Sequence, residues 1–600
     1  MKRKIMFGAA TVALVLGFSS CELLLTALGV DDDGSSYVET TAATDAVTWN
    51  YTSSNRIFKA DSSVLSVNVS GNIGGKTLYL VQVNPSDNNF VRKQSRQIAT
   101  SSLCADVVDE ESRAASENTF SEIDYSSLGT ATRKHFVGEK LPTLSEIPAS
   151  TDRSALDSAN LSVTQISRTV GTTKEIYIDY DSSMSSYKKA AATLRAVGTY
   201  CNVWIVDAYY KSSASGNKVN TAVAEKYVEA FDKMYPVITN VFGNESDKII
   251  NYDTQSVVNM ETLSDTGTKV NIVIYDIGAD YRSSDEVSTT GVVGYFYAKD
   301  YYYTTKSAIL LGGNSVMTKS NVGKYFYIDS GYANSNLDDT ISTLAHEFQH
   351  MVNFGVKDLA KNQSPDTSYN EMLSMLCEDM MQEFLGLTDK EAPKSRTQAF
   401  NLYYYASGIR EYRNDDYAVL SYSTSYLFGA WLCRQYGGAA LVKAMMSNAY
   451  VDSASIVAAV NSVNGTNYTF DDLFQQFLLA LVDDDDYTIN KNATQTITYS
   501  SGSTTYKYPM KKFDIRSSDY SPSSMDGFKS SEYPSYAWST YKNGGYLGPF
   551  LFSNSVLCDL RSKYGIQIHG IGKYASGKTS DTITFTANGA KDLELYLILE

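Results

Sequence analysis

Hydrophobic and polar positions follow two different periods along this chain. Between about residues 46 and 148 the pattern favours strands and turns: VLSVNVSGNIGG alternates apolar and polar positions, and KTLYLVQVN continues as an apolar run after a Gly-Gly turn signal. From residue 173 onward, strand-length apolar runs (EIYID, CNVWIVD and VNIVIYD) are interleaved with helical spacing in TAVAEKYVEAFDKMYPVI. The first region is therefore predicted to be a small β domain and the second a mixed α/β region.

The rest of the chain continues with strands, then helices, then strands again. GYFYA (294–298), AILLGG (308–313) and YFYID (325–329) predict short strands, and helical spacing follows from residue 344 to about 481. The charge run 483–486 is interpreted as a solvated helix end. Near the C-terminus, YGIQIHGIG, DTITFTA and LELYLILE return to β signals and predict a separate terminal sandwich.

The N-terminus has the pattern of an export signal. A basic KRK stretch precedes the apolar segment 5–18, which is shorter than a membrane span. Small residues then lead into Cys21, so the segment resembles a bacterial lipoprotein signal in which Cys21 is acylated and becomes the first mature residue. Phe18 departs from the usual aliphatic residue, which leaves an uncleaved anchor or a plain secretory signal open. The remainder is expected to work outside the cytoplasm, anchored in the cell envelope or at the cell surface.

The predicted fold class is α+β and multidomain, with a mixed core flanked by an N-terminal and a C-terminal β domain. The stretch that follows Cys21 is acidic and rich in Gly, Ser and Thr, which is typical of a solvated tether. The predicted divisions are a lipoprotein signal peptide (1–20), a flexible tether (21–45), an N-terminal β domain (46–150), the mixed domain (165–490) and a C-terminal β-sandwich domain (495–600).

Composition excludes several classes of function. The formal charge of -16 at pH 7 argues against nucleic acid as a partner, because phosphate-binding surfaces need clustered Lys and Arg. The cysteines beyond Cys21 are widely spaced and form no CxxC pair, so neither a disulfide framework nor a thiolate zinc site is indicated. Only four histidines are present in 600 residues, which makes their positions informative.

Two of those histidines occur together in LAHEFQHMVNF. His346 and His350 are four residues apart, so on a helix they lie about 40° apart around the axis and both imidazoles can converge on one ion. Glu347 lies between them in an HExxH pattern, which is typical of zinc hydrolases. In such a site the metal activates a water molecule and the glutamate acts as general base.

A hydrolytic zinc ion needs a third protein ligand and one open position. Glu371, in SYNEMLSMLCEDM, lies 21 residues after His350, which leaves room for a loop and a returning helix. The alternative interpretation is a capping box, in which Ser368 and Glu371 together cap a helix N-terminus. Glu378 lies two turns further on the same face and is predicted to orient a ligand histidine, with Asp379 as the alternative.

The motif as a whole resembles the gluzincin peptidases, on the evidence of HExxH and, about twenty residues later, Asn370-Glu371, Ser374 and the acidic pair at 378 and 379. With the strand YFYID before the motif and the export signal, it is most similar to the hyicolysin-like metallopeptidases of bacteria, over about residues 270–481. The resemblance implies a zincin-like core made of a mixed sheet lobe and a helical lobe. It also implies that His346, His350 and Glu371 hold one catalytic Zn²⁺.

A second group is expected to stabilise the oxyanion. Because His135 and His569 fall in the predicted flanking β domains, a tyrosine is favoured. YSTSYLFGAWLCRQYGG carries Tyr422 and Tyr426 one turn apart and resembles the Tyr-x-x-Gly helix of aminopeptidase N relatives, which implies Tyr426 as the catalytic tyrosine. The alternative is that Tyr426 is one of many packed tyrosines, since the chain contains 46.

The leading hypothesis is an extracytoplasmic, lipid-anchored zinc endopeptidase that acts on proteins or peptides. A surface adhesion or binding lipoprotein with a vestigial or structural zinc site is the alternative, although an intact Glu347 argues against it. A zymogen, with the region before Thr173 as an inhibitory propeptide, also stays open. Calcium is a weaker cofactor prediction, since no loop has the EF-hand spacing. The oligomeric state is not indicated.

Overall fold

A computed structural model describes most of the chain from residue 46 onward. The export signal, Cys21, the tether, His135, the predicted strand 308–313 and the charge run 483–486 all lie outside the described residues. The described residues are 46–60, 64–87, 98–100, 103–105, 169–180, 186–252, 256–260, 269–281, 292–303, 315–387, 395–413, 418–482, 497–501, 504–508, 515, 548–552, 554, 560–585 and 593–600.

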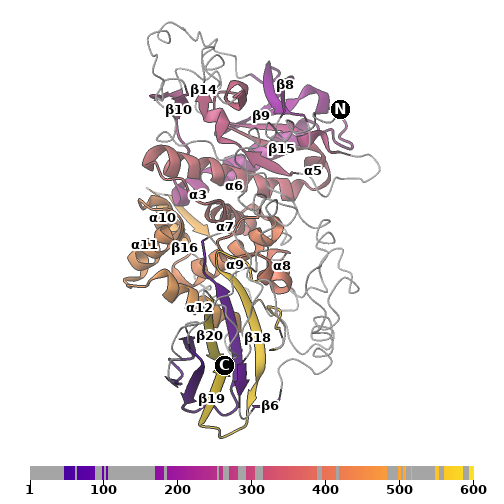
Figure 1. The fold of residues 1–600 in the computed structure, drawn as a ribbon. Coiled ribbons are helices and arrows are strands. Elements are labelled where there is room, and N and C mark those ends of the chain that lie inside the picture. The colour runs from indigo at the N-terminus through magenta and orange to yellow at the C-terminus, as the bar shows by residue number, and fades with distance from the viewer. Residues whose placement is uncertain are drawn as a thin grey trace, which may run out of the picture.

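A six-stranded mixed sheet forms the sheet lobe at the top of Figure 1. The three central strands β9, β12 and β15 are parallel and buried on both faces, which explains their continuous apolar runs. The outer strands pair antiparallel. The strand order is β13 (Gly294–Phe296), β15 (Tyr325–Asp329), β12 (Val270–Tyr275), β9 (Cys201–Val206), β8 (Tyr187–Val197) and β7 (Thr173–Asp179).

Helices and a smaller sheet complete this lobe. α3 (Thr221–Phe242) buries an apolar face against the large sheet. α5 (Ser330–Ser335) begins directly after β15, where Asp329 accepts a hydrogen bond from the Tyr332 backbone N–H as a helix cap. A three-stranded sheet joins β11 (Ser256–Asn259), β10 (Lys248–Asn251) and β14 (Tyr302–Tyr303). The short 3-10 helices are η2 (Asp207–Tyr209), η4 (Ile277–Ala279), η5 (Ala298–Tyr301) and η6 (Ser315–Lys319).

Helix α6 (Leu337–Asn353) contains the HExxH pattern and lies between the sheet lobe and the helices below it (Figure 1). It is buried on almost every side, with β13 and β15 on one side and α7 on another. Gly294 on β13 permits the close approach, because a Cβ there would meet Thr343 Cγ2 of α6 at 2.7 Å. The helix continues into a π-helical turn, η7 (Phe354–Leu359).

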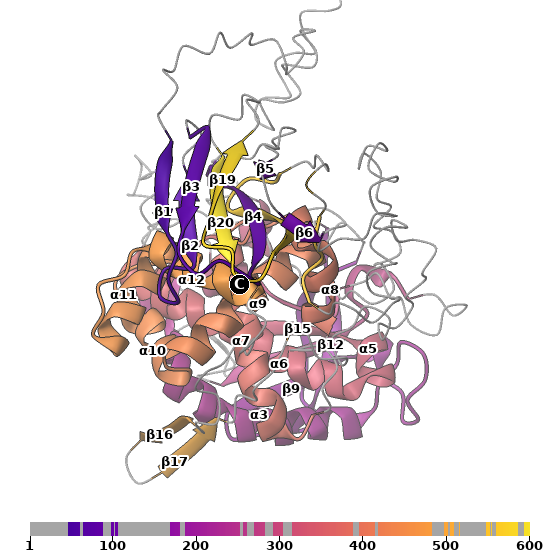
Figure 2. The same ribbon diagram turned by 90° about the horizontal axis from the view of Figure 1, so that it is seen from below.

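Within the described residues, the helices from α7 to α12 form the helical lobe in the middle of Figure 1. α9 packs closely on α7, where a Cβ on Gly429 would lie 2.6 Å from Met372 Cγ. A hairpin of β16 (Ile497–Ser501) and β17 (Thr504–Tyr508) projects at the lower left of Figure 2. The helices are α7 (Thr367–Leu385), α8 (Arg396–Tyr403), followed by η9 (Tyr404–Ala406), α9 (Ala418–Tyr436), α10 (Ala439–Ser447), α11 (Asp452–Asn464) and α12 (Phe470–Val482).

Strands from the two ends of the chain build the β unit at the bottom of Figure 1, where indigo and yellow strands lie side by side. The sequence analysis treats residues 46–150 and 495–600 as two separate β domains; in the structure their described strands share two sheets, which corrects that separation. One sheet has the order β1 (Val47–Asn50), β3 (Ser66–Ser70), β19 (Ser580–Phe585) and β5 (Ile98–Thr100). The other has the order β2 (Ile57–Ala60), β20 (Glu594–Leu599), β4 (Thr77–Asn84), β18 (Gly565–Tyr574) and β6 (Leu103–Ala105).

The five-stranded sheet is buried on both of its faces. On β4, Tyr79 and Val81 belong to the core shared with the sheet and helical lobes, while Leu78 and Leu80 belong to the core between the two sheets of the β unit. This alternation follows from the two-residue period of a strand. The fold is therefore α+β, with the β unit packed directly on the helices. None of the described helices has the length and apolar character needed to cross a bilayer.

Candidate metal centre

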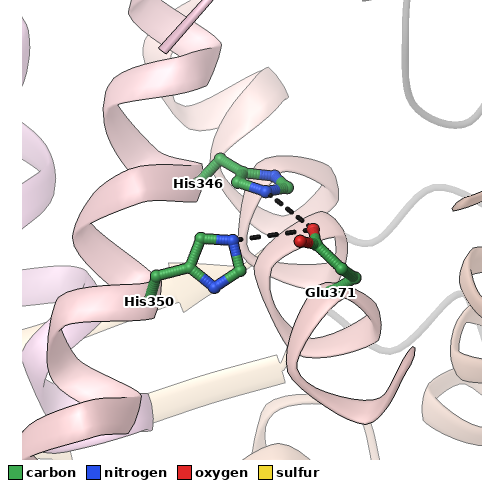
Figure 3. Close-up of side chains that lie close together, drawn as sticks. All are labelled: His346, His350 and Glu371. Atoms are coloured by element: carbon green, nitrogen blue, oxygen red, sulfur yellow. Dashed lines mark hydrogen bonds and ion pairs between the residues drawn. The ribbon is translucent and has the colours of Figure 1, made fainter. Parts of the chain in front are cut away.

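The structure brings His346, His350 and Glu371 together at the contact between α6 and α7 (Figure 3). Glu371 Oε2 lies 3.1 Å from His346 Nε2 and 3.5 Å from His350 Nε2. The imidazole rings are 4.7 Å apart between centroids and inclined at 76°. Two ring nitrogens and one carboxylate oxygen therefore face a common point, which is the donor set that zinc prefers in hydrolytic sites.

Burial and charge at this point favour a cation. Glu371 is 1% exposed, and its Oε1 is buried without a hydrogen-bond partner among the described residues. Burial alone would raise the pKa of Glu371, but the adjacent His350 and His346 hold it below its usual range. Burial would likewise lower the pKa of His346, yet its contacts with Glu371 and Glu378 raise it to about 10. A bound dication would compensate the buried Glu371 carboxylate, so these residues fit a metal ion.

The capping-box alternative for Glu371 is not formed. Asp366 is the N-cap residue of α7, so Ser368 already lies inside the helix and Glu371 lies beyond its first turn. The Ser368 hydroxyl donates instead to the backbone oxygen of Arg410, at 2.9 Å. Glu371 is thus available to the two histidines rather than to the helix terminus.

The second nitrogen of each imidazole contacts a residue of α7. His346 Nδ1 lies 2.6 Å from Glu378 Oε1, so Glu378 is placed where the sequence analysis expects it. His350 Nδ1 lies 3.1 Å from Asn370 Oδ1 and 3.0 Å from Ser374 Oγ. These contacts of Asn370 and Ser374 are not among the predictions from sequence, although their i, i+4 spacing puts both on one side of α7, next to Glu371.

Asp379 and Tyr426 form a different cluster. Asp379 is paired with Arg434 at 2.8 Å, and the Tyr426 hydroxyl donates to Asp379 at 3.0 Å. Asp379 adjoins Glu378 in sequence, but its side chain lies about 100° further around α7 and so points to α9 instead of α6. The expectation that Asp379 orients a histidine is therefore corrected, because its hydrogen bonds are to Arg434 and Tyr426 of α9. The catalytic role of Tyr426 stays a prediction.

Tyr422, one turn earlier on α9, is buried close enough to Glu371 and Glu347 for their charges to act on its hydroxyl. Burial raises the pKa of its hydroxyl, and so do the charge of Glu371, the neighbouring Tyr412 and the charge of Glu347. The Tyr412 hydroxyl lies 3.4 Å from that of Tyr422, and burial and Glu371 raise its pKa as well. The four-residue spacing within YSTSY contains this signal, but spacing alone does not decide which tyrosine points to the site.

Glu347 is fully buried beside the two histidines and contacts the edge strand of the sheet. Its Oε2 accepts a hydrogen bond from the Phe296 backbone N–H at 2.8 Å. The Asp329 backbone N–H donates to the Val293 carbonyl oxygen, three residues before Phe296 along the strand pair. Because hydrogen-bonded and non-hydrogen-bonded pairs alternate in an antiparallel ladder, the Phe296 N–H is turned away from β15 and toward α6. The edge of β13 therefore lies directly against the predicted general base.

A second group of carboxylates, Asp276, Asp280 and Asp329, lies where β12 and β15 end. Asp329 accepts hydrogen bonds from the backbone N–H groups of Ile277 and Tyr332, at 2.8 and 2.9 Å. These bonds are those of turn and helix caps, so calcium stays a prediction.

The comparison with protein families decides the classification. The family model described as Peptidase M30 matches residues 181–512, which is more than half of the chain and includes all three residues in Figure 3. This chain belongs to the peptidase M30 family. The resemblance to hyicolysin-like metallopeptidases is thereby confirmed. The family match takes in the sheet and helical lobes from residue 181 onward and leaves the strands of the β unit outside.

A curated relative of this M30 chain is the neutral metalloprotease ShpI of Staphylococcus hyicus, which is 28% identical over 257 residues. The match covers 41% of this chain and 48% of the relative. The chain therefore spans about half the length of the relative that it matches.

Proposed function

We propose that this M30 protein is an extracytoplasmic zinc-dependent endopeptidase that hydrolyses proteins or peptides. The sheet and helical lobes would form a zincin-like core, with His346, His350 and Glu371 as ligands of one catalytic zinc ion. The name of the relative, a neutral metalloprotease, supports a metallopeptidase activity. Acylation at Cys21 and anchoring in the cell envelope stay part of the proposal on the strength of the N-terminal pattern.

The observation that carries the proposal is the geometry around Glu371. Its Oε2 contacts an imidazole nitrogen of His346 and of His350, while its Oε1 is buried and has no hydrogen-bond partner among the described residues. An ordinary ion pair between helices would leave no orphaned oxygen, because an unsatisfied buried carboxylate oxygen is costly. A metal ion would account for both features.

Glu347 is proposed as the general base. When bound, zinc would lower the pKa of a coordinated water and polarise the scissile carbonyl. Glu347 adjoins His346 in sequence, yet its side chain lies about 100° away around the helix and contacts β13 instead of Glu371. It would hold the proton taken from the water and deliver it to the leaving amine.

The hydroxyl that stabilises the oxyanion is assigned to Tyr422 instead of Tyr426. Tyr422 is buried, lies within the electrostatic reach of both Glu371 and Glu347, and is close to Tyr412. A neutral phenol is a suitable donor to a developing negative charge, and the raised pKa keeps it neutral through the physiological range.

The decisive experiment compares metal content and proteolysis in three forms of the full chain. The wild type should contain about one zinc ion per chain and hydrolyse casein, and a chelator should abolish that hydrolysis. Glu347→Gln should retain the zinc and lose turnover by several orders of magnitude. Glu371→Ala should lose most of the zinc, since a ligand is removed.

Two results would contradict the proposal. Proteolysis retained in Glu347→Gln would remove the general-base role. A wild type that binds zinc and cleaves nothing would favour the adhesion or binding lipoprotein instead. Mass analysis of the mature chain would locate the N-terminus, and with it test both Cys21 and the propeptide alternative.

A further inference from the structure

Two neighbouring acids of α7 are each paired with a buried arginine from a different helix. Arg396, the first residue of α8, donates from Nη2 to Glu378 Oε1 at 2.8 Å. Arg434 of α9 donates from Nη1 and Nη2 to the two oxygens of Asp379, at 2.8 and 3.1 Å. Both arginines are less than 10% exposed. The two pairs thus have similar chemistry and burial.

The acid of the first pair makes a direct contact with a predicted metal ligand. Glu378 Oε1, which accepts from Arg396, also lies 2.6 Å from His346 Nδ1. Glu378 Oε2 accepts from the Ser342 hydroxyl at 3.0 Å. Three donors from three directions therefore fix the plane of this carboxylate. Asp379, in contrast, accepts from Arg434 and Tyr426 and contacts neither histidine through these bonds.

A carboxylate buried to this degree needs a compensating charge if it is to remain an acceptor. The Arg396 guanidinium supplies that charge and also sets the position of the oxygen that faces His346. With Glu378 accepting at Nδ1, the ring would carry its hydrogen there when a metal ion is bound, which would leave Nε2, on the side of Glu371, free to bind the ion. The orientation of His346 thus depends on Arg396 through the carboxylate that both residues contact.

We propose that Arg396 is a positioning residue for the metal centre, acting through Glu378 to hold the His346 ring with Nε2 toward the site. The proposal rests on the proposed zinc site. It assigns Arg434 no such role, which makes Arg434 the control: a buried arginine paired with the adjacent acid, Asp379, whose hydrogen bonds are to Arg434 and Tyr426 and not to a ligand histidine. The Arg396 guanidinium lies 5.6 Å from the centroid of the Tyr426 ring, so the control also shows how far a change at the second pair reaches the first.

The test measures zinc affinity of the full chain by competition with a chromophoric chelator, together with the absorption spectrum of the Co²⁺-substituted protein. Arg396→Gln should weaken zinc binding by about 10 to 100-fold, the range found when residues that orient a ligand are removed. It should also alter the Co²⁺ spectrum. Arg434→Gln should lower thermal stability but leave zinc affinity within about 3-fold of wild type and the spectrum unchanged.

A double-mutant comparison covers the case in which Arg396→Gln alone does not fold. Arg396→Met combined with Glu378→Gln removes both charges of the pair together. If Arg396 acts through Glu378, the double variant should bind zinc as Glu378→Gln does alone, whereas a further loss would overturn the proposal.

Two further outcomes would also overturn it: a folded Arg396→Gln variant with wild-type zinc affinity and Co²⁺ spectrum, or an equal loss of affinity in Arg434→Gln. Failure of the proposed function looks different, because in that case the wild type itself binds no zinc.

Discussion

Tyr422 and Tyr426 are separated by one helical turn of α9, and that turn decides which carboxylates each hydroxyl faces. Tyr422→Phe should lower kcat/KM on a peptide substrate by about 10² to 10³-fold with zinc content unchanged, because one oxyanion donor is lost. Tyr426→Phe should instead lower the free energy of unfolding by about 1 to 2 kcal/mol, through the lost bond to Asp379, and leave kcat/KM nearly unchanged. Peptidase assays and urea unfolding of both variants would distinguish the roles; full activity in Tyr422→Phe would contradict the assignment.

At the same scale, the sequence predicted the relative positions of side chains on one helix better than the contacts between side chains of two helices. The four-residue spacing of His346 and His350 fixes their relation on α6, and the face shared by Glu371 and Glu378 follows from the period of α7. The choice between Tyr422 and Tyr426 depends on the rotation of α9 against α7, which no local pattern records. The pairing of Asp379 with Arg434 depends on the same packing and was missed for the same reason.

At the scale of elements, the π-helical turn η7 extends the helix that carries the histidines and is attached to α10 by buried Lys357. Its Nζ donates to the backbone oxygens of Met445, Asn448 and Tyr450, at 2.6, 3.0 and 2.6 Å. In Lys357→Met the side chain should keep about the same volume, but these oxygens would lose their hydrogen-bond donor. The free energy of unfolding should therefore fall by about 2 to 4 kcal/mol. Urea unfolding at fixed zinc concentration measures this.

The control for this prediction is Lys361, which donates to carbonyls of the same turn from a more exposed position. Lys361→Met should cost less than about 1 kcal/mol, because water can replace the lost donor. An equal decrease in the free energy of unfolding of the two variants would show that the burial of Lys357 does not determine its contribution to stability.

The individual elements were largely predictable. The apolar runs at 175–179, 201–207 and 270–276 correspond to strands, and the amphipathic stretch 221–238 to a helix, because burial imposes a period on the sequence. The π-helical turn has no such period in the sequence, and the bonds of Lys357 within it are to carbonyls about 90 residues further along the chain. The capping-box alternative at the N-terminus of α7 was wrong, because the Ser368 hydroxyl donates to the backbone oxygen of Arg410.

At the scale of the whole molecule, the abundance of tyrosine predicts a steep alkaline limit of stability. Burial is the main cause that raises the pKa of these phenols above the unfolded value near 10. Each contributes stability that is fully present below about pH 10 and is lost as pH rises through its folded pKa, because the unfolded chain then binds fewer protons. The clearest cases are Tyr227, Tyr275, Tyr295, Tyr301, Tyr327 and Tyr422.

Unfolding and tyrosinate formation should therefore coincide above about pH 10, with stability falling by up to about 1.4 kcal/mol per pH unit for each such group. Absorbance of tyrosinate and far-ultraviolet circular dichroism, followed in one titration, would measure both events. Ionisation of most tyrosines while the circular dichroism stays constant would contradict this prediction.

The arrangement of the β unit was the feature that the sequence could not predict. The alternation in β3 and β19 indicates strands with one buried face but carries no information about which strand pairs with which. Predicting a sandwich at each end was the natural interpretation of two β-rich regions. In the structure, strands from the two regions pair in common sheets. β4, from the first region, lies between β18 and β20, which both come from the second.

This sharing has a consequence for biosynthesis. Gln82 on β4 contacts His569 on β18, 487 residues further along the chain. A ribosome therefore releases β4 long before either of its neighbours exists, and loop closure over such a distance is slow. Until β18 and β20 have been made, the early strands present open edges that invite aggregation, so chaperones have a reason to hold the nascent chain until its last strands emerge.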